Sequence, residues 1–268
     1  MTLLRIVIAA LAGGVLSTAA AAATLGLRST WIPRFVSFAV GALLGAVFLE
    51  LLPDALERGQ AQPVMLTVLI GLLAFFLLEK LVLWRHAHGH DEHSDLEEET
   101  EHDHALHSEG HGGHGRPDGG RSGLMILIGN SVHSFCDGIV IAAAFIADPA
   151  IGVATTLAIV AHAVPQQVGD FAVLLHSGFT RPKAFAYNIT TGAATLVGAL
   201  AAYVALADMQ QVLSYVLAIA GASLLYVAVA DLIPSLHRRS EPIETAKQML
   251  WIGLGIANIA TPHFLLEP

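Results

Sequence analysis

Long apolar stretches separated by short polar connections make up most of this chain. Crossing the hydrocarbon core of a bilayer takes a helix of about 20 apolar residues. By that measure the pattern predicts eight spans, at residues 4–25, 35–56, 64–84, 124–147, 151–175, 184–207, 212–236 and 249–265. The predicted fold class is an all-α integral membrane protein with eight transmembrane helices in one bundle.

One long polar segment divides the predicted bundle. Residues 1–84 carry the first three spans, residues 85–122 form the polar segment, and residues 123–268 carry the remaining five. The first span has an alternative interpretation as a cleaved signal peptide, because Arg5 precedes an apolar stretch that ends in the alanine-rich run 19–23. This stretch is longer than a usual signal core, which favours a retained helix.

The composition supports this assignment. Hydrophobic residues are 54% of the chain and charged residues 13%, and the mean hydropathy is +0.64, values too apolar for an ordinary soluble domain. The net charge of −9, with only 13 Lys and Arg residues against 22 Asp and Glu, argues against nucleic acid as a partner. A single cysteine, Cys136, excludes an internal disulfide and a multi-cysteine metal cluster.

The Lys and Arg residues of the connections predict the orientation. Eleven of the thirteen fall on one side of the predicted spans, and only Arg5 and Arg58 fall on the other. Because positive residues gather in cytoplasmic loops, we expect both termini outside and the segment 85–122 in the cytoplasm. The basic connection 236–248 should then lie near anionic lipid headgroups.

The polar segment is rich in histidine and in acidic residues. Such density of imidazole and carboxylate suits divalent metals, and the glycine-rich composition argues against a packed core. We therefore predict a disordered cytoplasmic metal-binding loop, although a solvated acidic linker with incidental histidines stays open. The candidate ligands are His86, His88, His90, His93, His102, His104, His107, His111 and His114.

Two neighbouring spans carry ionisable residues in mid-membrane. His133 and Asp137 are four residues apart in the fourth span, and His162, Gln166 and Asp170 follow the same spacing in the fifth, so each set lies on one helix face. An acid at the bilayer centre costs roughly 2.5 to 3.5 kcal/mol, and such groups normally mark a pathway or a site. The alternative is a set of hydrogen bonds that only hold helices together.

These residues carry a family resemblance. Residues 133–138 read His-Ser-Phe-Cys-Asp-Gly and residues 162–170 read His-Ala-Val-Pro-Gln-Gln-Val-Gly-Asp. They resemble the fourth- and fifth-helix signatures of the ZIP family of divalent-metal transporters, His-Asn-x-x-Asp-Gly and His-Glu-x-Pro-x-x-x-Gly-Asp. The resemblance implies transport of a divalent metal, zinc first, into the cytoplasm, and a 3+2+3 arrangement of helices with an inverted repeat.

The chain departs from the family pattern at three positions. Ser134 replaces the usual Asn, Ala163 replaces the usual Glu, and Gln166 stands where His or Glu is common. In the family these positions help to build a two-metal centre, so we expect the second metal position to be weakened or absent. The metal site that the resemblance implies consists of His133, Asp137, His162 and Gln166, with Asp170 and Asn130 lining the path.

Acidic residues near the ends of two other spans predict an entrance and an exit. Glu50 and Asp54 share a helix face near the outer end of the second span, and Asp231 and His237 lie near the inner end of the seventh. The similarity of residues 50–54 to residues 231–234 in a helix of opposite direction resembles an inverted repeat. Ordinary helix-end charges remain an alternative for each acid.

Other functional classes fit these residues less well. An intramembrane metalloprotease needs His-Glu-x-x-His, whereas Ala163 and Gln166 break that pattern, so we expect no enzyme and no resident cofactor. A transport-dead metal-binding sensor and a proton-coupled exporter stay open. The sequence does not rank Zn²⁺, Fe²⁺, Mn²⁺ and Cd²⁺ by ligand type, and beyond the metal and the lipid bilayer it leaves a homodimer open.

Overall fold

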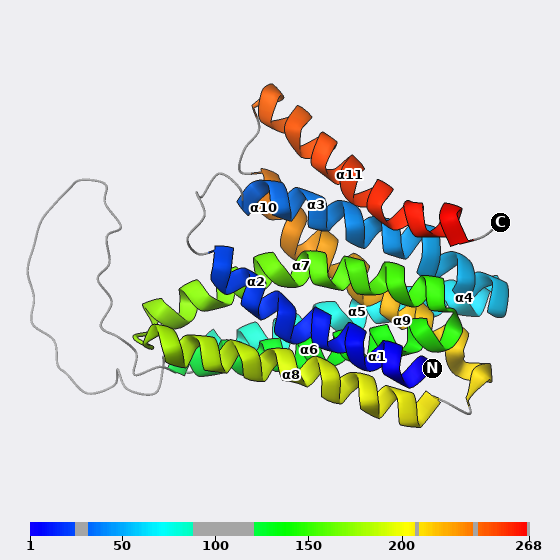
Figure 1. Ribbon diagram of the computed structural model, residues 1–268, viewed down its shortest axis with the longest axis horizontal. Helices are drawn as coiled ribbons and strands as arrows, with labels where there is room; N and C mark the ends of the chain where they lie inside the picture. The colour runs from blue at the N-terminus through cyan, green and yellow to red at the C-terminus, as the bar shows by residue number, and fades with distance from the viewer. Residues whose placement is uncertain (25–31, 88–120, 207–208, 238–240, 267–268) are drawn as a thin grey trace, which may run out of the picture.

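The computed structural model describes residues 1–24, 32–87, 121–206, 209–237 and 241–266, and these residues form helices and short turns (Figure 1). No strand occurs within those ranges, which confirms the all-α class. The elements are α1 (Thr2–Leu11), η1 (Ala12–Leu16), α2 (Ser17–Thr24), α3 (Ile32–Gly45), η2 (Ala46–Leu51), α4 (Leu52–Arg58), α5 (Ala61–Ala87), α6 (Arg121–Ala147), α7 (Pro149–His176), α8 (Arg181–Leu206), η3 (Gln210–Val212), α9 (Leu213–Tyr226), η4 (Val227–Leu232), α10 (Ile233–His237) and α11 (Pro242–Leu266).

Seven helices of the described part of the chain are long and apolar enough to cross a membrane. Each coincides with one of the first seven predicted spans, and three of them are continuous helices that contain a π-helical segment: α1–η1–α2, α3–η2–α4 and α9–η4–α10. The eighth predicted span lies within α11, which is not among the seven. The eight-helix count therefore stays a prediction.

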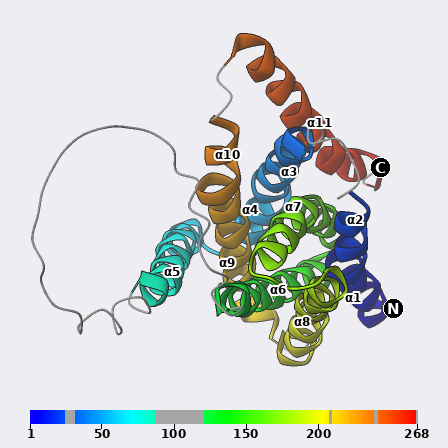
Figure 2. The same cartoon turned by 90° about the vertical axis from the view of Figure 1, so that its left-hand side faces the viewer.

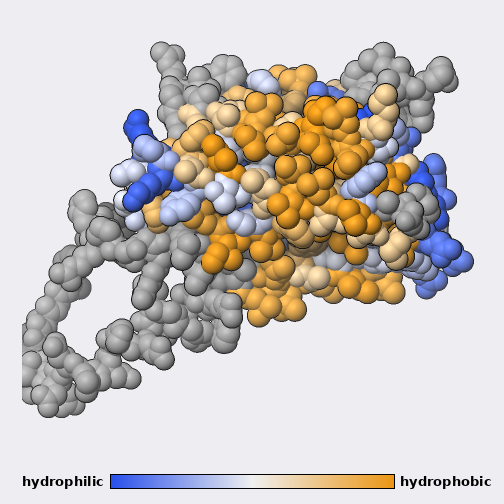
Figure 3. Space-filling view, turned by 60° about the horizontal axis from the view of Figure 1, so that its bottom comes forward, coloured by the Kyte–Doolittle hydropathy of each residue, from blue (hydrophilic) through white to orange (hydrophobic). Residues whose placement is uncertain are grey.

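The outer surface of the bundle is apolar. On α5, large apolar side chains such as Leu66, Leu69, Leu73 and Phe76 are exposed. Figure 3 shows hydrophobic residues across the middle of one face and hydrophilic residues at its two ends. This distribution is typical of a protein surrounded by lipid hydrocarbon, where no driving force buries apolar side chains.

The helices pair in a pattern that supports the predicted repeat. The long helix α3 pairs with α11, and α9 pairs with α5; viewed along the bundle, α5 and α11 lie at its edge (Figure 2). Exchanging the first three spans with the last three converts one pairing into the other. The helices of the first span pack on α7 and α8, and α8 packs most extensively on α6. Thus α6 and α7 pack on each other, on α8 and on the helices of the first span, and the 3+2+3 arrangement stays a prediction.

Glycines set the closest approach between α6 and α8. A Cβ atom on Gly138 of α6 would collide with the carbonyl oxygen of Thr195, and one on Gly198 of α8 would collide with the carbonyl oxygen of Phe135. Small residues of this kind let helix backbones approach closely in a membrane. The contact at Phe135 fixes the part of α6 between His133 and Asp137.

Candidate metal centre

The hairpin of α6 and α7 brings the two signatures together. Only Asp148 separates the helices, and its carboxylate Oδ1 accepts a hydrogen bond of 2.6 Å from the backbone N–H of Ala150. Pro149 occupies the first turn of α7. Backbone N–H groups there have no acceptor within the helix, so the N–H that proline lacks costs no hydrogen bond. This tight connection makes the two helices antiparallel neighbours, so that the middle of one faces the middle of the other.

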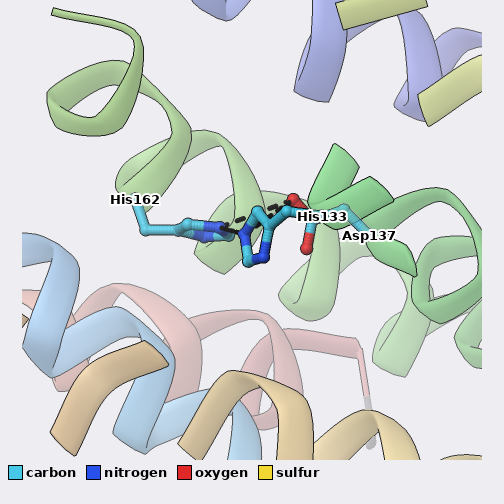
Figure 4. A group of neighbouring side chains, drawn as sticks. All are labelled: His133, Asp137 and His162. Carbon is cyan, nitrogen blue, oxygen red and sulfur yellow. Dashed lines mark hydrogen bonds and ion pairs between the residues drawn. The ribbon is translucent and has the colours of Figure 1, made fainter. Parts of the chain in front are cut away.

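Three predicted ligands converge between these helices. His133 Nε2 lies 3.4 Å from His162 Nε2. The Oδ2 atom of Asp137 lies 3.6 Å from His133 Nε2 and 3.5 Å from His162 Nε2. Figure 4 shows the two imidazoles and the carboxylate pointing toward one another, and the three side chains form a group that could hold a metal ion.

The backbone of α7 fixes the tautomer of His162. Its Nδ1 atom lies 3.2 Å from the carbonyl oxygen of Ala158, one turn earlier. A carbonyl oxygen only accepts, so Nδ1 carries the proton and donates it. In the neutral ring, Nε2 then presents its lone pair toward Asp137 and His133, which is the form in which imidazole binds a metal.

The triangle of ligand atoms has the size that a tetrahedral metal requires. Zinc bound at about 2.0 to 2.1 Å with tetrahedral angles places its ligand atoms about 3.3 to 3.4 Å apart, close to the observed 3.4, 3.5 and 3.6 Å. The other carboxylate oxygen of Asp137, Oδ1, is buried and has no hydrogen-bond partner among the described residues. A buried carboxylate oxygen without a donor favours a cation nearby.

A cavity of about 250 Å³ gives access to this centre from one side. The side chain of His133 is 23% exposed, whereas those of Asp137 and His162 are 5% and 1% exposed. Only His133 of the three lines the cavity, so the other two form the closed back of the site. The cavity lies between α5, α6, α7 and the α9–η4 helix, and its lining residues include Phe75, Gly129, Asn130, Gln166, Ser223, Tyr226 and Asp231.

The remaining central candidates lie outside the triangle. Gln166 and Asn130 line the cavity beside His133. The half-buried carboxyl group of Asp170 lies next to the Asn130 side chain, one turn of α7 beyond Gln166. The structure thus places one of the two predicted path residues, Asn130, along the cavity, whereas Asp170 is not among its lining residues, and three of the four proposed ligands converge at its closed end.

The entrance and exit candidates differ in their surroundings. Glu50 is buried on η2. Asp54 pairs with Arg58 at 2.5 Å, and Arg58 also donates a hydrogen bond of 3.0 Å to the carbonyl oxygen of Ala147. Asp231 is exposed and lines the same cavity as His133, and His237 is exposed at the end of α10.

The histidine-rich segment contributes little to the structural description. His86 lies in the last turn of α5. The other eight predicted loop ligands, and most of the predicted segment 85–122, lie outside the described residues.

Sequence reasoning missed two polar residues of the cavity wall. Ser223 and Tyr226 of α9 line the cavity together with Asp231. Their spacing of three residues within a strongly apolar span is the signal that identifies them, because polar side chains on one face of such a helix usually face a cavity.

The chain is similar to known proteins over most of its length. A family model described as ZIP Zinc transporter matches residues 2–261. Zinc transporter ZIP13 of Homo sapiens is 31% identical over 260 residues, covering 84% of this chain and 69% of that protein. Zinc transporter ZIP13 of Pongo abelii is 31% identical over 240 residues, covering 84% of this chain and 65% of that protein. Zinc transporter ZIP4 of Homo sapiens is 31% identical over 270 residues, covering 81% of this chain and 40% of that protein.

Proposed function

Because this chain belongs to the ZIP zinc transporter family, we propose that it carries a divalent transition metal, zinc first, across the membrane into the cytoplasm. The metal binds midway to His133, Asp137 and His162. The observation that carries this proposal is the triangle of their ligand atoms, within 4.8 Å of one another on two neighbouring helices.

The charge of the ligands favours reversible binding of the metal ion, as transport requires. Asp137 supplies one negative charge and the two imidazoles supply none, so the bound ion keeps a net positive charge. Three protein ligands leave the fourth position of a tetrahedral zinc open to water. Exchange of that water from the cavity beside His133 provides a route for ligand exchange without unfolding the site.

The cavity supports a direction for release. It is lined by the later half of α5 and the early part of α6, and the histidine-rich segment joins these two helices. The positive residues of the connections favour a cytoplasmic place for that segment and outside termini. The ion then leaves past Gln166, Asn130 and Asp231 toward the cytoplasm, where the loop histidines bind it.

The substitutions at Ser134 and Ala163 support a single metal position. Neither a hydroxyl nor a methyl group replaces the carboxylate that a second divalent ion needs nearby. Ser134 and Ala163 are both buried, so water does not substitute freely for the missing ligands. One ion per transport cycle is the stoichiometry that this centre supports.

A reconstituted system tests the function directly. The full-length protein is placed in liposomes loaded with a zinc-sensitive dye, and influx of zinc is compared for the wild type, Asp137→Ala and Asp137→Asn. The asparagine variant keeps the volume and removes the charge. Glu57→Gln, at an exposed residue of α4, removes one charge away from the centre and serves as the control.

The proposal expects zinc influx in the wild type and in Glu57→Gln, and none above empty liposomes in either Asp137 variant. Influx that survives in both Asp137 variants contradicts the assignment of the centre. Zinc bound by wild type without any influx favours the transport-dead sensor instead. The same assay with Fe²⁺, Mn²⁺ and Cd²⁺ ranks the metals.

A further inference from the structure

Two π-helical segments in the bundle have the same design. The segments η2 (Ala46–Leu51) and η4 (Val227–Leu232) are each six residues long, and each carries an acid at its fifth position, Glu50 or Asp231. The residue after each segment donates its backbone N–H to the carbonyl oxygen five residues earlier, Leu52 to Val47 and Ile233 to Ala228. This i to i−5 bond defines a π-helical turn.

The sequence explains why both helices widen at the same place. Pro53 and Pro234 stand two residues after the last residue of their segments. A proline has no N–H to donate, and its ring crowds the carbonyl group four residues earlier. An extra residue in the preceding turn relieves this crowding, and π-helical turns of this kind are frequent at functional sites.

The two segments also occupy equivalent places in the bundle. The segment η2 packs against α9, and η4 packs against α3, so each lies on the helix that carries the other. The short helices that follow, α4 and α10, lie at opposite ends of the bundle (Figure 1). Glu50 and Asp231 are therefore related as an inverted repeat relates two positions.

The two acids differ in exposure despite this equivalence. Glu50 is 5% exposed, whereas Asp231 is exposed and lines the cavity that leads to His133. Such an asymmetry arises when the two halves of an inverted repeat adopt different conformations. When the halves exchange these conformations, the central site becomes accessible from the other side of the membrane.

We propose that Glu50 and Asp231 are a pair of equivalent carboxylates that are exposed alternately, one in each state of the transport cycle. In the present state Asp231 faces the cavity and Glu50 is enclosed. In the opposite state Glu50 faces a cavity that opens at the α4 end, and Asp231 is enclosed. This inference rests on the proposed function for its cargo, a divalent cation, which each carboxylate attracts toward the central ligands from its own side.

The reason for alternation is electrostatic. A carboxylate attracts a cation most strongly where surrounding hydrocarbon lowers the dielectric constant, but exposing both acids at once would connect the two sides of the membrane. Enclosing one while the other is open keeps the attraction on the accessible side only. The prolines keep the widened turns in place, so that each acid holds its position in the turn.

Cysteine labelling tests the alternation without depending on zinc flux. Glu50→Cys, Asp231→Cys and the double variant are made in a Cys136→Ser background, which removes the only natural thiol. A membrane-impermeant cationic thiol reagent is applied to reconstituted protein from one side at a time. Glu57→Cys, on the exposed face of α4, is the control for reagent access at that end.

The proposal expects the thiol of the Asp231→Cys variant to react from the α10 end only, and that of the Glu50→Cys variant to react from the α4 end only. In the double variant, prior modification at position 231 wedges its cavity open and should slow labelling at position 50 at least tenfold, with Glu57→Cys unaffected. Equal labelling of position 50 before and after modification at position 231 overturns the proposal. Labelling of position 50 from the α10 end overturns it as well.

A conservative substitution provides a second measurement. Glu50→Gln keeps the shape of the enclosed side chain and removes its charge, so uptake should fall at least tenfold while zinc affinity at the central site changes less than twofold. Unchanged uptake contradicts a role for Glu50. Because labelling reports access and the Asp137 variants report zinc transport, failure of one is distinguishable from failure of the other.

Discussion

The Nε2 atoms of His133 and His162 lie 3.4 Å apart, and the two rings meet edge to face at 85°. Since Nδ1–H of His162 donates a hydrogen bond to the carbonyl oxygen of Ala158, its Nε2 offers a lone pair and not a proton in the neutral ring. Two imidazole nitrogens and the nearby Asp137 oxygen therefore surround a point suited to a cation.

Removing one imidazole should weaken metal binding strongly. His162→Ala takes away the most buried ligand and leaves a two-ligand site. Loss of a ligand costs more than loss of an outer-shell partner, which typically weakens binding 10- to 100-fold, so we expect zinc affinity to fall at least about 100-fold. Isothermal titration of purified protein with segment 86–114 replaced by a Gly-Ser linker measures this, with Glu57→Ala, at an exposed residue of α4, as the control. Equal affinities of the two variants would contradict the role of His162.

The wild-type centre should hold one zinc ion, and restoring the family residues should add another. The double substitution Ser134→Asn and Ala163→Glu returns an amide and a carboxylate beside His133 and His162. In chains whose segment 86–114 is replaced by a Gly-Ser linker, so that the loop histidines contribute no zinc, we expect bound zinc, measured by elemental analysis after removal of free metal, to rise from one to two per chain. A wild-type value of two would refute the single-site prediction, and a variant that stays at one would show that other residues limit the second position.

Close contact between α6 and α8 should be needed for the shape of the centre. Gly198→Ala forces a methyl group against the carbonyl oxygen of Phe135, so the helices separate or the backbone shifts. Overpacking of this kind typically costs about 1 to 3 kcal/mol, and zinc affinity should fall with it. Thermal unfolding in detergent and zinc titration measure both effects. Gly253→Ala on α11, where an added Cβ meets nothing within 4 Å, should lower neither.

Deleting residues 86–114 tests the role of the histidine-rich segment. Since the central ligands lie on α6 and α7, we expect the deletion to alter regulation or apparent affinity while zinc influx continues. A flexible Gly-Ser linker of equal length replaces the segment and keeps the connection between α5 and α6. Complete loss of influx with normal zinc binding at the centre would show that the segment takes part in transport itself.

Much of the centre was predictable because its information is local. His133 and Asp137 are one helical turn apart, and that spacing alone places them on one face. The one-residue connection at Asp148 then makes α6 and α7 antiparallel neighbours, which brings His162 to the same level. The seven apolar stretches were equally accessible, since a span is recognised from its own length and composition.

What the sequence left unpredicted depends on contacts between distant segments. Asp231 shares a cavity with His133, although the two lie far apart along the chain and the acid stands near the end of its span. Gln166 lies along the cavity and outside the triangle of ligand atoms, a distinction that helical spacing does not make. The π-helical turns at Glu50 and Asp231 require backbone geometry, although Pro53 and Pro234 mark the places where they form.

The short hairpin of α6 and α7 has a consequence for the energetics of the cycle. All three ligands of the proposed centre lie on these two consecutive helices, and the proton on His162 is held within α7 itself. If the hairpin moves as a unit, the ions meet the same ligand set from either side of the membrane. Such a centre binds the ion equally well from both sides, so in the absence of a coupled ion the net flow of zinc follows its electrochemical gradient, and a low free zinc concentration in the cytoplasm favours inward flow.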